Sequence, residues 1–175
     1  RSPVASLMEN LIQVLEQESE EYEGLLSLSQ KKTPIIVSSD LEKLQKITDD
    51  EQVIVSRINQ LERKRTEVVA DIANVLNRDV DTLKLANLIE MLAARPVEQA
   101  KLAEAHDSLQ KSVYGLKRVN EQNRELLTNA LEMIEFEMNL LQASKAAPET
   151  ANYNKGAYNA GDTMGVYNGG FDAKQ

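Results

Sequence analysis

The chain has 175 residues, enough for one domain of ordinary size, and a formal net charge of −8. An acidic surface has no general affinity for phosphate backbones, which argues against nucleic acid as a partner. The absence of cysteine and the single histidine exclude thiolate and histidine-rich metal sites. No apolar run approaches the ~18 residues of a membrane span, so we expect no membrane insertion.

Glycine and aromatic residues are concentrated at the end of the chain. Five of the seven glycines and four of the seven aromatic residues follow residue 150. The preceding part is rich in Leu, Glu, Lys and Gln, which is the composition of long helices. We therefore expect a helical domain over residues 1–145 and a Gly/Tyr/Asn-rich tail over residues 146–175. The first residues lack the apolar stretch of a signal peptide, which predicts a cytoplasmic location.

Two long helices are predicted in the first half of the chain. The first runs from about Pro3 to Ser29, with apolar residues spaced alternately by four and three. The second begins at a capping box over residues 39–42 and ends near Leu76. Prolines tolerate only the first turn of a helix, so Pro34 is expected in the connection between the two helices.

A short helix and a very long helix are predicted in the second half. Turn-forming residues at 77–82 precede a helix at about Leu83–Ala93, with Asp81 as its N-cap. The last helix begins near Pro96 and ends at about Ser144, a length of roughly 70 Å. Helices this long cannot form a globule. The predicted fold class is all-α: an elongated antiparallel helical bundle or coiled coil of three long helices plus one short helix, with an irregular C-terminal tail.

Polar residues interrupt the apolar seams of the second and fourth helices. They are Glu51, Arg65, Asn120 and Asn123. Polar groups in a seam cost stability unless they are paired, and they can define register and partner number. If Leu76 lies level with Val97, Glu51 comes near Asn120, Asn123 and Arg124, and Arg65 comes near Asp107. These residues form either a structural hydrogen-bond layer or a site that holds another chain.

The end of the fourth helix has more apolar residues than one bundle face requires. Ten of the 16 residues from Leu126 to Leu141 are apolar, whereas a bundle face needs about three in seven. The methionines add adaptable surface. The stretch is either the centre of a three-helix core or a groove for a partner. The candidate binding residues are Leu126, Leu127, Leu131, Met133, Ile134, Met138 and Leu141.

The tail repeats the pattern Tyr-Asn-x-Gly three times, beginning at Tyr153, Tyr158 and Tyr167. It contains no Leu or Ile, so it cannot form a core of its own. A tyrosine ring buries area while its hydroxyl stays hydrogen-bonded. We therefore expect the three tyrosines to anchor the tail on the bundle or on a neighbouring chain, with a flexible tail as the alternative.

No catalytic constellation is visible. There is no Gly-rich phosphate loop and no nucleophile elbow. Di-iron bundles use Glu-x-x-His pairs, but the residue three before His106 is Ala103. We expect no enzymatic activity, catalytic residue, cofactor or bound metal.

The order and spacing of these features resemble the FlgN family of flagellar export chaperones, over roughly Leu7–Leu141. The resemblance rests on the start of the second helix and on its polar seam: Asp40-Leu41-Glu42-Lys43-Leu44, then Glu51 followed by Ile54, Ile58, Leu61 and Arg65. The most specific stretch is Asn120-Glu121-Gln122-Asn123-Arg124-Glu125-Leu126-Leu127, continuing into Ala130, Leu131 and Ile134.

This resemblance implies a non-catalytic chaperone. Its C-terminal half would bind C-terminal helices of the flagellar hook–filament junction proteins, prevent their premature assembly and deliver them to the flagellar type III export apparatus. Amphipathic helices that would otherwise aggregate are sequestered when a helical groove completes a bundle around them. The alternative is a structural coiled-coil protein that uses the same apolar face for homodimerisation, and a weak homo-oligomer is left open.

Overall fold

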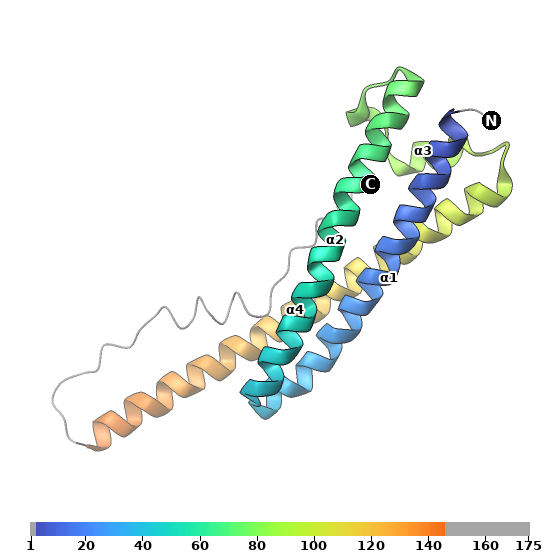
Figure 1. Cartoon of the computed structure of the whole chain (residues 1–175). Helices are drawn as coiled ribbons and strands as arrows, with labels where there is room; N and C mark the ends of the chain where they lie inside the picture. The colour runs from blue at the N-terminus through green and yellow to red at the C-terminus, as the bar shows by residue number, and fades with distance from the viewer. Residues whose placement is uncertain (1–2, 146–175) are drawn as a thin grey trace.

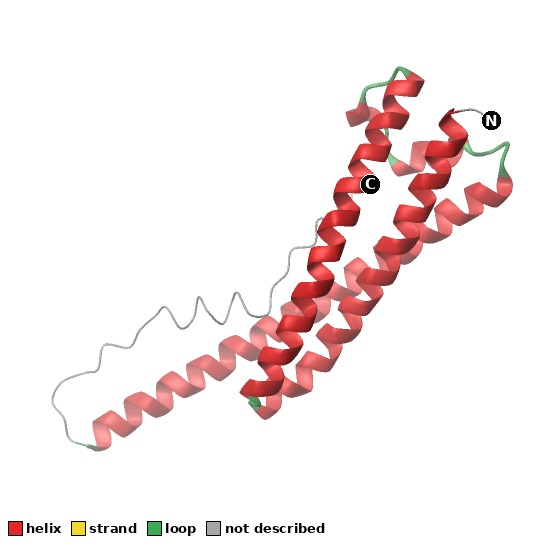
Figure 2. Ribbon diagram, viewed as in Figure 1, coloured by secondary structure: helices red, strands yellow, loops and turns green. Residues whose placement is uncertain are grey.

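The computed structural model describes residues 3–145, and its regular elements in that range are all helical (Figure 2). The long helices are α1 (Pro3–Ser38), α2 (Leu41–Leu76) and α4 (Pro96–Ser144), and the short helix is α3 (Leu85–Met91). A 3-10 helix, η1 (Val80–Thr82), precedes α3. The all-α class and the bounds of α4 are confirmed. Among the described helices, none combines the length and apolar character that crossing a membrane requires.

Helix α1 packs against both other long helices (Figure 1). Hydrogen bonds between α1 and α4 join residues whose sequence numbers differ by a nearly constant amount, 89 for Ser19–Ser108 and 90 for Thr33–Asn123. Such a constant separation means that α1 and α4 run parallel. Separations between α1 and α2 instead grow toward the N-terminus, from 22 for Ser29–Glu51 to 40 for Tyr22–Glu62, so this pair is antiparallel.

Helix α1 is longer than predicted because it continues through Pro34. Proline removes one helical N–H, which normally ends a helix. Pro34 is exposed, however, as is Gln30, whose carbonyl this N–H would have bonded. The next turn places Ile36, 5% exposed, in the core. The burial of this turn outweighs the lost hydrogen bond, and the prediction that helix 1 ends at Ser29 is wrong.

Two predicted N-caps also differ in the structure. Asp40, rather than Ser39, caps α2, with its carboxylate accepting a bond from Lys43 N at 3.1 Å. Ser39 has φ 57° and forms the tight turn after α1. Asp81 lies inside η1, whose cap is Asp79, so the third helix begins later than predicted. Asp79 and Asp81 are both turn-forming residues, and local sequence does not distinguish which of them accepts the capping bond.

The core has two parts along the bundle axis. The larger joins α1, α2 and α4 and is closed by Leu83, Leu85, Leu88 and Leu92 from the α3 region. The smaller lies near the α1–α2 turn and consists of Ile36, Leu44, Ile47 and Leu127, which we call the distal cluster. Leu85, Leu88 and Leu92 are buried on one side of the third helix, and Ile89 is partly buried against the same core.

Helix α4 is longer than its partners, with 49 residues against 36 for α1 and 36 for α2. It begins near the N-terminal part of α1, where Arg95 contacts Glu9. Because it runs parallel to α1 from there, it extends past the α1–α2 turn (Figure 1, orange). Leu127 is its last buried residue. We call residues 131–144, beyond the distal cluster, the arm.

Candidate partner-binding site

A buried polar layer crosses the bundle between the larger core and the distal cluster. Glu51 of α2 accepts bonds from Lys32 Nζ at 2.8 Å and from Ser29 Oγ at 3.0 Å. On the other side of α1, Asn123 Nδ2 donates to the Ser29 carbonyl at 2.9 Å. Thr33 Oγ1 donates to Asn123 Oδ1 at 2.6 Å. The layer therefore joins all three long helices through α1.

The predicted burial of Glu51 is confirmed, but its predicted hydrogen-bond partners are wrong. Instead of Asn120, Asn123 or Arg124, Glu51 bonds Ser29 and Lys32 of α1. The register prediction paired α2 with α4 directly and ignored the helix that contacts both. The missed signal is the continuation of the α1 seam from Leu25 to Ser29, Lys32 and Ile36 in steps of four, three and four.

The second polar seam residue of α2 also pairs with α1. Arg65 Nε lies 3.5 Å from Glu18 Oε1, and both side chains are buried. Asp107, the predicted neighbour of Arg65, is exposed at the surface beside His106. Asn120 is buried on α4. All four polar seam residues are therefore buried inside the bundle, and Glu51, Arg65 and Asn123 each contact α1.

Burial raises the pKa of Glu18 to about 7, against the opposing attraction of Arg65, and the neighbouring Glu62 raises it further. Within the described residues, neither carboxylate oxygen of Glu18 accepts a hydrogen bond. Glu62 does accept one, from the Tyr22 hydroxyl at 3.1 Å, and burial again raises its pKa. Glu18 and Arg65 are therefore enclosed in the bundle, whereas Glu62 is half-buried.

The arm exposes most of its apolar side chains. Leu127, 8% exposed, belongs to the distal cluster, and Leu126 is half-buried and packs against that cluster. Leu131 is half-buried. The remaining predicted binding residues, together with two apolar neighbours left out of that prediction, are between 46% and 62% exposed: Met133, Ile134, Phe136, Met138, Leu140 and Leu141. This stretch is therefore not the centre of a three-helix core, except at its first two leucines.

The large apolar side chains of the arm form two stripes along it. The inner stripe, Leu131, Ile134, Met138 and Leu141, continues from Leu127 in steps of three and four residues. It therefore extends the same face of α4 that packs on α1 and α2. The outer stripe is Met133, Phe136 and Leu140. At about 100° per residue, it lies roughly 150° around the helix from the inner stripe.

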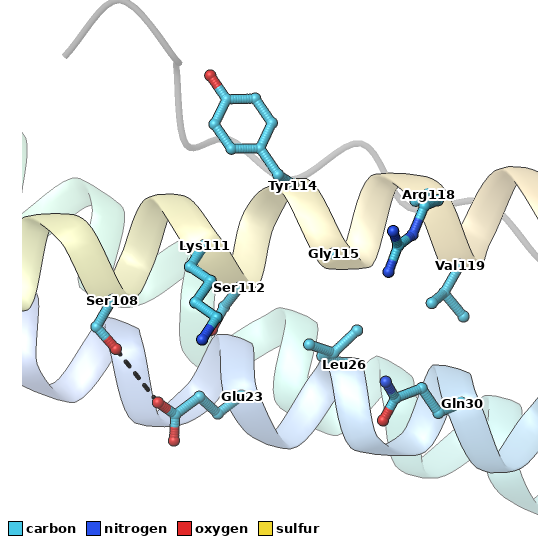
Figure 3. Close-up of a pocket in the computed structure, with 10 residues that line it drawn as sticks. All are labelled: Glu23, Leu26, Gln30, Ser108, Lys111, Ser112, Tyr114, Gly115, Arg118 and Val119. Atoms are coloured by element: carbon cyan, nitrogen blue, oxygen red, sulfur yellow. Dashed lines mark hydrogen bonds between the residues drawn. The ribbon is translucent and has the colours of Figure 1, made fainter.

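A separate open groove of about 670 Å³ lies between α1 and α4 (Figure 3). Its α1 wall includes Glu23 and Leu26. Its α4 wall includes Lys111 and Gly115, where an added Cβ would approach Leu26 to 3.3 Å. Tyr114 projects away from α1 at the rim, with Lys117 Nζ 5.9 Å from its ring centroid. The lining mixes both charges and apolar surface, so it indicates no particular ligand.

No group of three or more His, Asp and Glu side chains in residues 3–145 is placed to hold a metal ion. The predicted tail anchors Tyr153, Tyr158 and Tyr167 lie outside the described residues. The arm is thus the large unpartnered surface that the described part of the chain offers to another helix.

Two comparisons with known proteins find similarity over most of the chain. A family model described as FlgN protein matches residues 7–160, which extends beyond the boundary expected after residue 145. A protein of Bacillus subtilis (strain 168), named "Uncharacterized protein YvyG", is 26% identical over 133 residues, covering 76% of each chain. No solved structure matches the chain.

Proposed function

Because the chain belongs to the FlgN family of flagellar export chaperones, we propose that the arm is its client-binding site. The clients are the hook–filament junction proteins, bound through the amphipathic helices at their C-termini. Binding takes place in the cytoplasm and prevents premature assembly of these proteins. The chaperone then delivers them to the flagellar type III export apparatus.

One observation carries this proposal: the buried face of α4 continues into the arm without a partner from α1 or α2. Exposed apolar area of this extent marks interaction surfaces in folded proteins. A client helix laid against the inner stripe would continue the packing that α1 and α2 provide along the part of α4 before the arm. Helix-in-groove binding of this kind uses anchors at i, i+3, i+4 and i+7, the spacing of the inner stripe.

Charged substitutions in the inner stripe test the site. We expect Leu131→Asp or Ile134→Asp to weaken co-purification with junction proteins by at least about tenfold, because a carboxylate would be desolvated against the client. Glu20→Lys, at an exposed position of α1, is the control and should bind as the wild type. Circular dichroism must show the same helix content for each variant. Equal client recovery with all three folded variants would eliminate the arm as the site.

A further inference from the structure

The arm has two apolar stripes, but one bound helix covers only one of them. The outer stripe contains Phe136, which is 62% exposed, between two large apolar neighbours. A helix that is apolar around most of its circumference is normally surrounded by partners. A client helix on the inner stripe would leave the outer stripe in water, since the two stripes lie on different sides of the arm.

Every ionisable side chain within the arm is a glutamate: Glu132, Glu135 and Glu137. Successive residues advance by about 100°, which places Glu135 and Glu137 on the two borders of the inner stripe. Glu132 and Glu137 border the outer stripe in the same way. Residues at these border positions select the partner of a coiled coil by charge. The nearest basic residues, Arg124 and Lys145, lie outside the arm.

A second copy of this chain is a poor occupant for either stripe. In an antiparallel pair of arms, Leu131 would face the partner's Leu141, and the glutamates on the stripe borders would meet the same glutamates of the other arm. Like charges at these positions oppose pairing, and each chain carries a net charge of −8. The borders are instead complementary to Lys and Arg.

We propose that the arm is clasped between two helices of its client, each with an apolar stripe bordered by basic residues. This rests on the proposed function, and it adds the number of client helices and their charge. The inner helix completes the bundle, and the outer helix covers Phe136 on the other side of the arm. Glu137, which borders both stripes, contacts basic residues of both helices.

The first test measures the outer stripe by calorimetric titration of the full chain with junction-protein C-terminal segments. We expect Phe136→Ser/Leu140→Ser to weaken binding by about tenfold or more, as loss of a buried aromatic anchor does. Ile134→Ser/Leu141→Ser, in the inner stripe, is the matched variant. If only the inner-stripe variant loses affinity, one helix binds and the clasp is wrong. If the wild type binds no segment at all, it is the proposed function that fails.

The second test measures the charge of the borders. We expect Glu137→Gln to weaken binding by about threefold at low salt, and the effect to shrink at high salt. Glu121→Gln, at an exposed position on α4 below the arm, should leave affinity unchanged. Synthetic amphipathic peptides with Lys borders should bind more tightly than the same peptides with Glu borders. Equal binding of the two peptides would overturn the charge assignment, and dimerisation of the chain through its outer stripe would overturn the client as occupant.

Discussion

Glu18 shows how much a single enclosed carboxyl group influences this bundle. Its side chain is 0% exposed, and its nearest cation, Arg65, stands at 3.5 Å, beyond good hydrogen-bond distance. Burial raises its pKa from 4.5 to about 7, because the charged form loses more hydration than Arg65 returns. The folded chain therefore holds a proton on Glu18 at pH values where the unfolded chain has released it.

The stability of the bundle should consequently fall as pH rises through this window. Between about pH 4.5 and 7 the folded state binds more protons than the unfolded state, so the free energy of unfolding decreases with rising pH. The full effect is about 3 kcal/mol. Glu18→Gln lacks this contribution, so the stability of the variant relative to the wild type should increase from pH 5 to 8. Urea denaturation across this range measures the difference, and parallel pH profiles for the two proteins would contradict it.

At the scale of helices, the polar layer holds α2 and α4 in register on α1. Glu51 and Lys32 form a buried ion pair at 2.8 Å, with Ser29 completing the carboxylate's bonds. A buried pair of this kind adds little net stability over an apolar pair of the same volume, but removing one partner is costly. The pair lies between the larger core and the distal cluster, a position suited to aligning α2 with α1.

Substituting one member of this pair should be worse than substituting both. We expect Glu51→Leu to lower the free energy of unfolding by about 3–5 kcal/mol, because the Lys32 ammonium loses its buried counter-charge. Adding Lys32→Met should recover most of that loss. A double-mutant cycle by thermal denaturation measures the coupling. Additive losses in the two single variants would show that the pair contributes no specific interaction.

Local sequence signals predict some of these elements well. Pro96 suits the first turn of a helix, and Pro148 follows the end of α4 at Ser144, so both bounds of α4 are predictable. The end of α1 is not, because whether a helix continues through Pro34 depends on the burial of the turn that follows. The partners of Glu51 depend on which helix lies between the others, and that is a property of the assembled bundle.

The candidate site, like the fold, can be predicted from the sequence only in part. The apolar excess between Leu126 and Leu141 is visible in the sequence, but its division into core and exposed arm is not. That division follows from the length of α1 and from the parallel direction of α1 and α4. Together they leave α4 without a partner once Leu127 has packed against Ile36. The outer stripe is likewise recognisable only after the inner stripe has been assigned to the buried face.

At the scale of the whole molecule, the buried part of α4 and the proposed binding site are different segments of the helix. The buried residues of α4 lie between Leu102 and Leu127, whereas the large apolar residues from Met133 onward are exposed. Exposed residues contribute little to the stability of a fold. We therefore expect the bundle to fold without the arm, so that substitutions in the arm can test the proposed client recognition without unfolding the protein.

Two truncated chains separate these roles. We expect a chain ending at Ala130 to have a free energy of unfolding within about 1 kcal/mol of that of the full chain, because surface positions contribute little to stability. The same chain should bind no junction protein.

A chain ending at Lys145 keeps the arm and removes Tyr153, Tyr158 and Tyr167. If those tyrosines compete for the arm, its client affinity should rise; if they contact the client, it should fall. Urea denaturation and client titration measure both properties. Client binding by the Ala130 chain would refute the arm as the site, and unchanged affinity of the Lys145 chain would remove the tyrosines from client recognition.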